Sequence, residues 1–322
     1  MFYISSQGHS ATAWLSRSLN VHPNIVCWHG SRSLPPYATN DQYYRNFSVK
    51  EFVSGLQSCE KNTFGQKVFG ATHGFYGIAI KQEIEKKGGN FFAIFRHPYA
   101  KINSIFSAYY PYKLTKGIIG TDEIKLDYSN FFTEFSEKIN QKCFDLENKK
   151  KKKEKIKYLL RKSNLLAHAK IINKYFIKYK NKLKIKQKNL IKKDTIDINS
   201  YPDNKKVDSA IDTFMHACIR TFETDLELIN NCSFDQILQM EEFTSSKKKF
   251  NMILKKVTGF EMNSKQLEQV FKNKNHINIH SVKKNINEIY KTWPDGFKNI
   301  IQQYLLNKKL KRFYNKLNYI ID

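Results

Sequence analysis

Short apolar runs alternate with amphipathic segments along the first 115 residues of the chain. The runs occupy residues 2–5, 24–28, 67–72 and 90–95, and each is continuously apolar. Continuous runs of this length are typical of parallel strands that are buried on both faces. Helical patterns fill the intervals, at residues 12–20, 49–60, 76–87 and 98–110. This order predicts a parallel sheet with ligands at the carboxyl ends of its strands.

A second strand–helix pair is predicted late in the chain. Residues 234–240 read as a fifth strand, and residues 246–259 follow as a helix with Gly259 at its end. Glycine is favoured there because the residue after a helix often takes a left-handed backbone conformation. The pattern as a whole predicts an α/β fold in three layers, αβα, with a central and mainly parallel sheet. A single domain spanning residues 1–322 accommodates it.

Residues 145–205 differ from the rest of the chain. They are rich in lysine, poor in acids, and carry apolar residues at roughly helical spacing. This pattern predicts long basic helices that are inserted into the α/β domain or cap it. Two roles stay open: the helices lie on an anionic membrane surface, or they pack their apolar stripe on the domain and leave the lysines in water.

The charge balance points to an acidic partner. The 322 residues include 55 Lys and Arg against 29 Asp and Glu, a formal net charge of +26. Nucleic acid, an anionic membrane or a phosphorylated small molecule would fit such a balance. Abundant Lys, Asn and Ile are also what AT-rich coding produces, so much of the lysine can be solvated surface. Hydrophobic residues at 41% argue against disorder.

The cysteines and the hydropathy favour a cytoplasmic protein. Five cysteines are scattered without a C-x-x-C pair, which fits reduced thiols better than a disulfide framework. No apolar run approaches the roughly 20 residues that span a bilayer. The opening apolar residues are followed at once by a turn, and we expect no signal peptide.

The turn after the first strand has the composition of an anion site. It reads S-S-Q-G-H-S-A-T-A-W over residues 5–14, so that Gly8 permits a tight turn while Ser10 and Thr12 offer hydroxyls. Backbone N–H groups at a helix start carry partial positive charge and bind anions. Ordinary helix capping explains the hydroxyls equally well. The phosphate loop G-x-x-x-x-G-K-[ST] is absent, which argues against a nucleoside triphosphatase.

Two more strand ends carry distinctive side chains. Arg96 ends the strand at 90–95, Pro98 suits the first helical turn, and Ser104 lies on the following helix. An arginine in this place can hold a phosphate with two hydrogen bonds. His73 follows the strand at 67–72, where an imidazole could take a proton from a substrate hydroxyl.

Together the three segments resemble the sulfotransferase superfamily, whose donor is 3′-phosphoadenosine 5′-phosphosulfate (PAPS). The resemblance covers residues 2–110 and, less fully, 234–260, and it implies a P-loop NTPase-like fold. The family's 3′-phosphate element matches Arg96 and Ser104, and its catalytic histidine, in a K-[TS]-H-type strand end, matches His73. The family's loop P-K-S-G-T-T-W aligns with Gly8, His9, Ser10, Ala11, Thr12, Ala13 and Trp14.

The loop departs from the family at three positions. His9 replaces the lysine, Ala11 the glycine and Ala13 the second threonine. An imidazole with an unperturbed pKa is roughly a quarter charged at pH 7, and a phosphosulfate beside it would raise that pKa. Losing one electrostatic contact of this kind costs on the order of 10²–10³ in rate. An active enzyme, a slow enzyme and a binding protein therefore stay open, and the retained residues favour the first.

The resemblance implies transfer of a sulfuryl group from PAPS to a hydroxyl or amine of a carbohydrate, lipid or small molecule, without a metal. His73 would be the general base and His9 would face the leaving oxygen, while Lys283 and Lys284 would close over the nucleotide. Trp14 either stacks on the adenine or belongs to the core. His29 and Arg32 either line the acceptor pocket or cap a helix.

Three other functions compete with this interpretation. A nucleic-acid-binding protein would fit the charge, but the sequence has no zinc spacing and no RNA-recognition signature. Another phosphate-loop transferase or a kinase is the second, and the missing loop lysine and the lack of an evident Mg²⁺-binding acid after a strand count against it. A non-catalytic relative that scaffolds membrane enzymes would bind the nucleotide without turnover. We therefore expect PAPS and an acceptor as partners and do not expect nucleic acid, while membrane contact through the basic helices stays open.

Overall fold

The computed structural model of the chain describes residues 1–6, 10–29, 48–61, 67–72, 78–115, 128–162, 201–272 and 286–321. These residues contain a five-stranded sheet in the order β2-β3-β1-β4-β5, and all of its neighbouring pairs are parallel. The strands are β1 (Phe2–Ser5), β2 (Ile25–His29), β3 (Val68–Thr72), β4 (Asn90–Phe95) and β5 (Ile237–Gln239). The predicted α/β class with a parallel sheet is thus confirmed.

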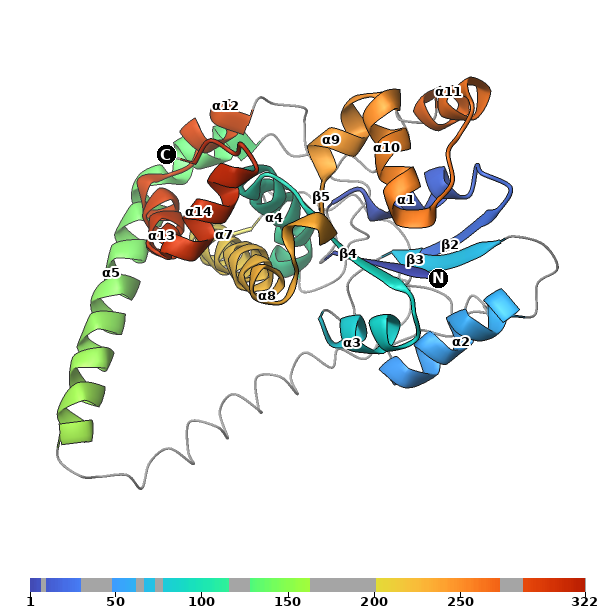
Figure 1. The fold of residues 1–322 in the computed structure, drawn as a ribbon. Helices are drawn as coiled ribbons and strands as arrows, with labels where there is room; N and C mark the ends of the chain where they lie inside the picture. Colours follow the sequence, from blue (N-terminus) through green and yellow to red (C-terminus); the bar gives the residue numbers. More distant parts are fainter. Residues whose placement is uncertain are drawn as a thin grey trace.

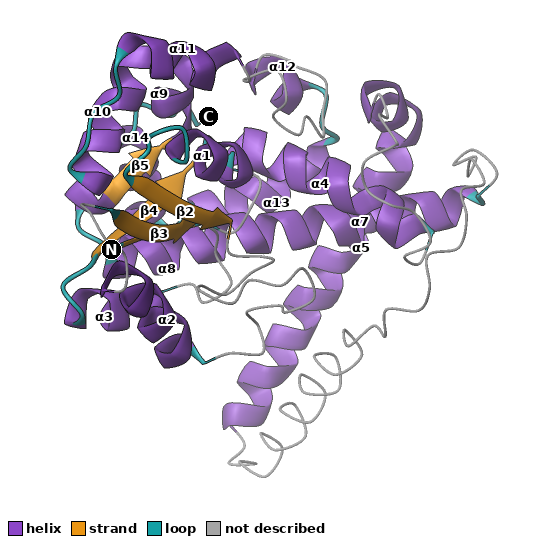
Figure 2. Ribbon diagram, turned by 90° about the vertical axis from the view of Figure 1, so that its right-hand side faces the viewer, coloured by secondary structure: helices purple, strands orange, loops and turns teal. Residues whose placement is uncertain are grey.

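Helices lie on both sides of the sheet, as Figures 1 and 2 show. The first half of the chain contributes α1 (Thr12–Leu19), α2 (Val49–Lys61), α3 (Ala79–Lys86), α4 (Pro98–Leu114) and α5 (Tyr128–Lys162). The second half contributes α7 (Asp203–Cys218), the π-helical turn η4 (Ile219–Glu223), α8 (Thr224–Asn231), the 3₁₀ turn η5 (Phe234–Gln236), α9 (Met240–Ser245), α10 (Lys247–Thr258), α11 (Ser264–Lys272), α12 (Ile286–Lys291), α13 (Asp295–Leu305) and α14 (Lys308–Lys316).

The strands are continuously apolar because both faces of the sheet are covered. Phe2 and Ile4 of β1 point into one buried cluster, with α1, α10 and α11, whereas Tyr3 between them points into the other, with α2, α3 and α4. In β4, Phe92 and Ile94 join the first cluster while their neighbours join the second. This alternation is the geometry of a strand, whose successive side chains face opposite sides. The arrangement is that of a three-layer αβα fold.

Most predicted bounds agree with the structure to within a few residues, but the fifth strand is shorter than predicted. Only Ile237–Gln239 of the predicted 234–240 is extended, and the residues before it form η5. Ser233 and Gln236 cap that turn reciprocally, side chain to backbone. Gly259 ends α10 with a φ of 80°, as predicted for the residue after the helix.

The lysine-rich segment is only partly described. Helix α5 begins at Tyr128, well before the predicted start at residue 145, and continues to Lys162. Its first half packs Phe132, Phe135 and Ile139 into the core, and Figure 1 shows the rest of the helix extending away from the sheet. Residues 163–200 lie outside the described residues. The prediction of an inserted basic helical segment is therefore not decided.

A buried ion pair joins the helix that follows β4 to two later helices. Lys101 of α4 donates from Nζ to Oδ1 of Asp225 in α8, at 2.8 Å, and Tyr314 of α14 donates its hydroxyl to Oδ2 at 2.7 Å. The three side chains are at most 1% exposed. Burial raises the pKa of Asp225, while Lys101 and Tyr314 oppose that rise.

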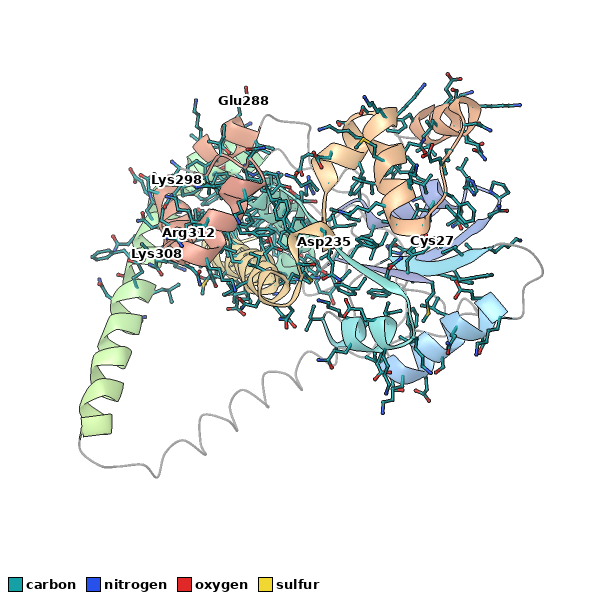
Figure 3. All side chains as sticks on the ribbon, in the orientation of Figure 1. Cys27, Asp235, Glu288, Lys298, Lys308 and Arg312 are labelled. Atoms are coloured by element: carbon teal, nitrogen blue, oxygen red, sulfur yellow. The ribbon has the colours of Figure 1, made fainter. Side chains whose placement is uncertain are left out.

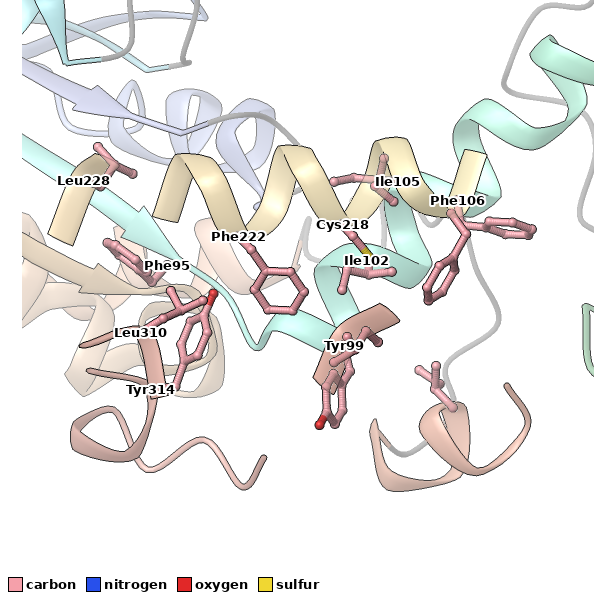
Figure 4. Packing of buried hydrophobic residues seen from close by; sticks show 14 of the residues in the cluster. Phe95, Tyr99, Ile102, Ile105, Phe106, Cys218, Phe222, Leu228, Leu310 and Tyr314 are labelled. Carbon is pink, nitrogen blue, oxygen red and sulfur yellow. The ribbon is translucent and has the colours of Figure 1, made fainter. Parts of the chain in front are cut away.

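Apolar side chains surround this group. Figure 4 shows Tyr314 and Leu310 of α14 beside Phe95 at the end of β4 and Phe222 of η4. Charged groups without water cost free energy unless each is paired and hydrogen-bonded. The carboxylate of Asp225 has both a cation and a hydroxyl donor, so the network fastens α4, α8 and α14 together.

Candidate functional site

The turn after β1 leads directly into the positive end of a helix. Ser6 and Ser10 are buried, and α1 begins at Thr12 with Ala11 as its N-cap residue. Ala11 provides no side-chain cap, and the first turn of α1 has no acidic residue. The first N–H groups of a helix have no partner inside it, so an external anion suits them. Gly8 and His9 lie outside the described residues.

Ala11 has a left-handed backbone conformation, with φ at 56° and ψ at 24°. A residue with a side chain loses roughly 1–2 kcal/mol in this conformation, whereas glycine adopts it readily. The sulfotransferase loop has glycine at the aligned position. The chain therefore keeps at Ala11 a backbone shape that glycine would favour, although the glycine itself is replaced.

Replacing Ala11 by glycine is expected to raise the free energy of unfolding by about 0.5–1 kcal/mol. The strain at positive φ disappears, and this gain exceeds the added flexibility of the unfolded chain. Chemical denaturation measures the change. Ala13→Gly, inside α1, is the matched control and should lower stability by about 0.5–1 kcal/mol. If both variants lost the same free energy of unfolding, the backbone of Ala11 would not be strained.

Hydrogen bonds connect the start of α1 to the ends of β2 and β3. Thr72, the last residue of β3, donates its hydroxyl to the carbonyl oxygen of Thr12 at 3.1 Å. The hydroxyl of Thr12 lies 3.2 Å from Nε2 of His29, which ends β2. His29 therefore has a polar contact within this edge of the sheet. His73, which follows Thr72 in the chain, lies outside the described residues, as does Arg32.

The turn after β4 places Arg96 at the same edge. Strand β4 pairs with β1 in the register Ser5↔Ala93, so both strands run to the same end of the sheet. Burial lowers the pKa of Arg96, while the charge of Glu241 opposes this. A guanidinium stays protonated in proteins, so Arg96 remains a partly buried cation. Pro98 occupies the first turn of α4, as predicted.

Glu241 is a polar residue of this edge that the sequence did not identify. It follows β5 and accepts two hydrogen bonds, from the backbone N–H of His97 at 2.9 Å and from the Tyr319 hydroxyl at 2.7 Å. The sequence signal was the acid in "ILQMEEF", directly after a predicted strand. Because the guanidinium has five donors, Arg96 can interact with Glu241 and with a second anion at once.

The residues after α14 return to the same edge. The Leu317 carbonyl accepts from Gln239 Nε2 at 2.7 Å, and the Ile320 carbonyl lies 3.2 Å from Nε2 of His97. Burial lowers the pKa of His97, mainly through loss of solvation. The neutral imidazole then donates from Nε2 to Ile320 and leaves Nδ1 as an acceptor.

Two buried polar atoms at this edge lack a hydrogen-bond partner in the described part of the chain. They are Ser6 Oγ, in the turn after β1, and His97 Nδ1, in the turn after β4. Because nearly all buried polar atoms in proteins are bonded, each such atom needs an explanation, for example a bound water or ion. Strands β1 and β4 are neighbours, so the two turns adjoin.

Trp14 and Ser104 are both buried. The Trp14 ring is 5% exposed and stacks on Phe243 at 6.1 Å, with edge contacts to Phe250 and Phe271. The ring is therefore packed into the buried cluster that includes Phe2 and Ile4. Ser104 of α4 is also 5% exposed. It lies one turn beyond Lys101, near the helix face that Lys101 turns toward Asp225.

The predicted site is thus described in part. Ser10 and Arg96 lie in turns at one edge of the sheet, and Thr12 and Ala13 are the first residues of α1. Lys283 and Lys284, like His9 and His73, lie outside the described residues. A cavity of about 440 Å³ lies elsewhere, between α5 and α13, with Glu137, Glu147 and Asp295 in its lining.

Three further features concern the described residues as a whole. No three His, Cys, Asp or Glu side chains there gather as metal ligands, and none of the helices there combines the length and apolarity needed to cross a membrane. The five cysteines are free thiols. Comparisons with known proteins complete the picture: no family model, no curated protein and no solved structure matches the chain significantly.

Proposed function

We propose that the chain is a PAPS-dependent sulfotransferase whose nucleotide binds across the turns after β1 and β4. One observation carries the proposal: Ser6 Oγ and His97 Nδ1 are buried without a partner in adjoining turns, beside the helix start at Ala11. A ligand with both anionic oxygens and hydroxyl groups would satisfy an uncapped helix and these two atoms. The motif resemblance supplies the identity of that ligand.

The residues have distinct roles in this proposal. The backbone N–H groups at residues 10–13, with the hydroxyls of Ser10 and Thr12, bind the 5′-phosphosulfate end. Arg96 binds the 3′-phosphate with charge-assisted hydrogen bonds, and Ser104 is its second ligand. PAPS supplies an activated sulfuryl group, and adenosine 3′,5′-bisphosphate (PAP) remains as the product.

The acceptor side of the proposal depends on two histidines. His73 takes the proton from the acceptor hydroxyl or amine as general base, an effect worth about 10²–10⁴ in rate. His9 stands where the family has lysine and offers positive charge to the leaving oxygen. The acceptor class is a carbohydrate, a lipid or a small molecule. We place the reaction in the cytoplasm, in keeping with five free thiols.

Glu241 and Tyr319 serve in this proposal to hold Arg96. The Glu241 carboxylate is fixed by the His97 N–H and the Tyr319 hydroxyl, so it forms a rigid neighbour for the guanidinium. A guanidinium that is already oriented loses less side-chain freedom when it binds phosphate. The same carboxylate repels a second anion, which limits the affinity that Arg96 can give.

A nucleotide-binding protein without turnover is the second candidate. The replacement of the loop lysine by His9 favours it, since a partly charged imidazole stabilises a leaving group less than an ammonium does. Binding of PAP with no transfer to any acceptor would establish this second function.

Thermal unfolding with PAP tests the proposed site. PAP at 100 times its dissociation constant should add about 2.7 kcal/mol to stability and raise the midpoint by several degrees. ATP and adenosine 5′-monophosphate, which lack the 3′-phosphate, should give much smaller shifts. Equal shifts with PAP and ATP would contradict the 3′-phosphate site. A shift of the unfolding midpoint with RNA but none with PAP would contradict the nucleotide site and favour nucleic-acid binding through the net positive charge.

A further inference from the structure

In residues 296–321, at the end of the last described range, every charged side chain is positive. Residues 296–321 contain no Asp or Glu, and their basic residues are Lys298, Lys308, Lys309, Lys311, Arg312 and Lys316. All but the first of these belong to α14. An excess of one charge over so long a stretch creates a field that attracts polyanions.

Helix α14 turns its cations outward. Leu310 and Tyr314 are 1% and 0% exposed and fix the inner side. At 3.6 residues per turn, Lys308, Arg312 and Lys316 form a line along the opposite side, and Lys309 and Lys311 flank it. All five are exposed, and Figure 3 labels Lys308 and Arg312. We call these five residues the α14 basic surface.

The α14 basic surface has no acidic partners among the described residues. No ion pair there includes any of its five side chains, and Lys309 donates instead to the Asn230 side-chain oxygen. By contrast, α10 pairs Lys247 with Glu268, Lys249 with Glu242 and Lys255 with Glu261. Like charges four residues apart destabilise a helix. An anionic partner would relieve that repulsion.

Large apolar side chains are exposed next to these cations. Leu306, just before α14, is 80% exposed, and Ile320, just after it, is 67% exposed. Phe234 is 57% exposed and meets Phe313 of α14 edge-on at 6.3 Å. Aliphatic side chains gain from contact with acyl chains, whereas phosphate and base edges offer them little. Cations with protruding apolar residues fit the interface of a lipid bilayer.

We propose that the α14 basic surface docks on an anionic lipid bilayer, with Leu306 entering the headgroup region. This contact does not depend on the proposed sulfotransferase activity, and it lies outside residues 145–205, for which the sequence left lipid contact open. Each cation near an anionic membrane raises the partition coefficient roughly fivefold. The attraction is screened over about 8 Å at physiological ionic strength.

Vesicle sedimentation of the full chain tests the proposal. The probes are phosphatidylcholine vesicles with and without phosphatidylserine. We expect binding to the anionic vesicles only. The combined variant Lys308→Gln, Lys309→Gln, Arg312→Gln and Lys316→Gln should reduce it by about 10²–10³-fold, and Leu306→Ser should reduce it by about tenfold. Added salt should weaken binding of the native chain.

A charge-matched control separates the α14 basic surface from net charge. Lys247→Gln, Lys249→Gln, Lys255→Gln and Lys265→Gln remove the same number of exposed cations from α10 and α11 and should leave most of the binding intact. Equal losses in the two combined variants would overturn the proposal. So would an α14 variant that binds vesicles normally but loses affinity for RNA. Thermal unfolding of each variant should stay near native, because the altered side chains are exposed.

Discussion

Replacing Lys101 by methionine is expected to lower the free energy of unfolding by about 3–5 kcal/mol. Lys101 and Asp225 form a 2.8 Å ion pair in which both side chains are at most 1% exposed. Without the ammonium, the Tyr314 hydroxyl is the one side-chain donor to the buried carboxylate that remains among the described residues. Chemical denaturation monitored by circular dichroism measures the loss.

Two further variants identify the cause of that loss. Lys138→Met removes a lysine from the 2.7 Å pair with Asp203, in which both side chains are about half exposed. It should change stability very little, since water screens such pairs. Adding Asp225→Asn to Lys101→Met should restore part of the loss, because no buried charge remains. If Lys101→Met were as stable as Lys138→Met, the buried pair would not stabilise the packing of these helices.

Arg96→Ala and His73→Ala are expected to separate nucleotide binding from transfer. Loss of the charge-assisted bonds of Arg96 should weaken PAP binding by roughly 10–100-fold and abolish the preference for PAP over adenosine 5′-monophosphate. His73→Ala should leave PAP affinity nearly unchanged while lowering the transfer rate by about 10²–10⁴-fold. Calorimetric titration and single-turnover transfer to a responsive acceptor give the two quantities.

Arg17→Ala is the matched control for the charge of Arg96. Arg17 is an exposed arginine near the end of α1. The Arg17→Ala variant should leave PAP affinity almost unchanged. If Arg17→Ala and Arg96→Ala weaken PAP equally, the 3′-phosphate is not bound by Arg96. A His73→Ala variant with native turnover would remove the general-base role from this residue.

The strands were predictable because their apolar residues follow from burial on both sides of the sheet. Tyr3 packs under α2 while Phe2 and Ile4 pack under α1, so no polar position interrupts the run. The fifth strand was predicted too long. Ser233 and the first three residues of that predicted strand, "FDQ", fit the capping-box pattern S-x-x-Q, which marks a helical turn rather than a strand.

The site was harder to predict than the sheet. The turn sequences located Arg96 and the start of α1, since strand ends meet at one edge of a parallel sheet. Glu241 was visible only as an acid after a strand, because its partners His97 and Tyr319 are distant in sequence. For Trp14, the sequence left a core and a ligand role open. The packing of Phe243, Phe250 and Phe271 around its ring depends on three later helices.

The C-terminal contacts at the strand ends have a consequence for biosynthesis. Strands β1 to β4 are contained within the first 95 residues, so a nascent chain has their whole sequence early. The turn after β4, however, takes its partners from Glu241, Tyr319 and Ile320. Residues 319 and 320 must leave the ribosome before this turn is complete. The sheet can therefore begin to assemble during translation, whereas the Arg96 turn matures only after residues 319 and 320 have been made.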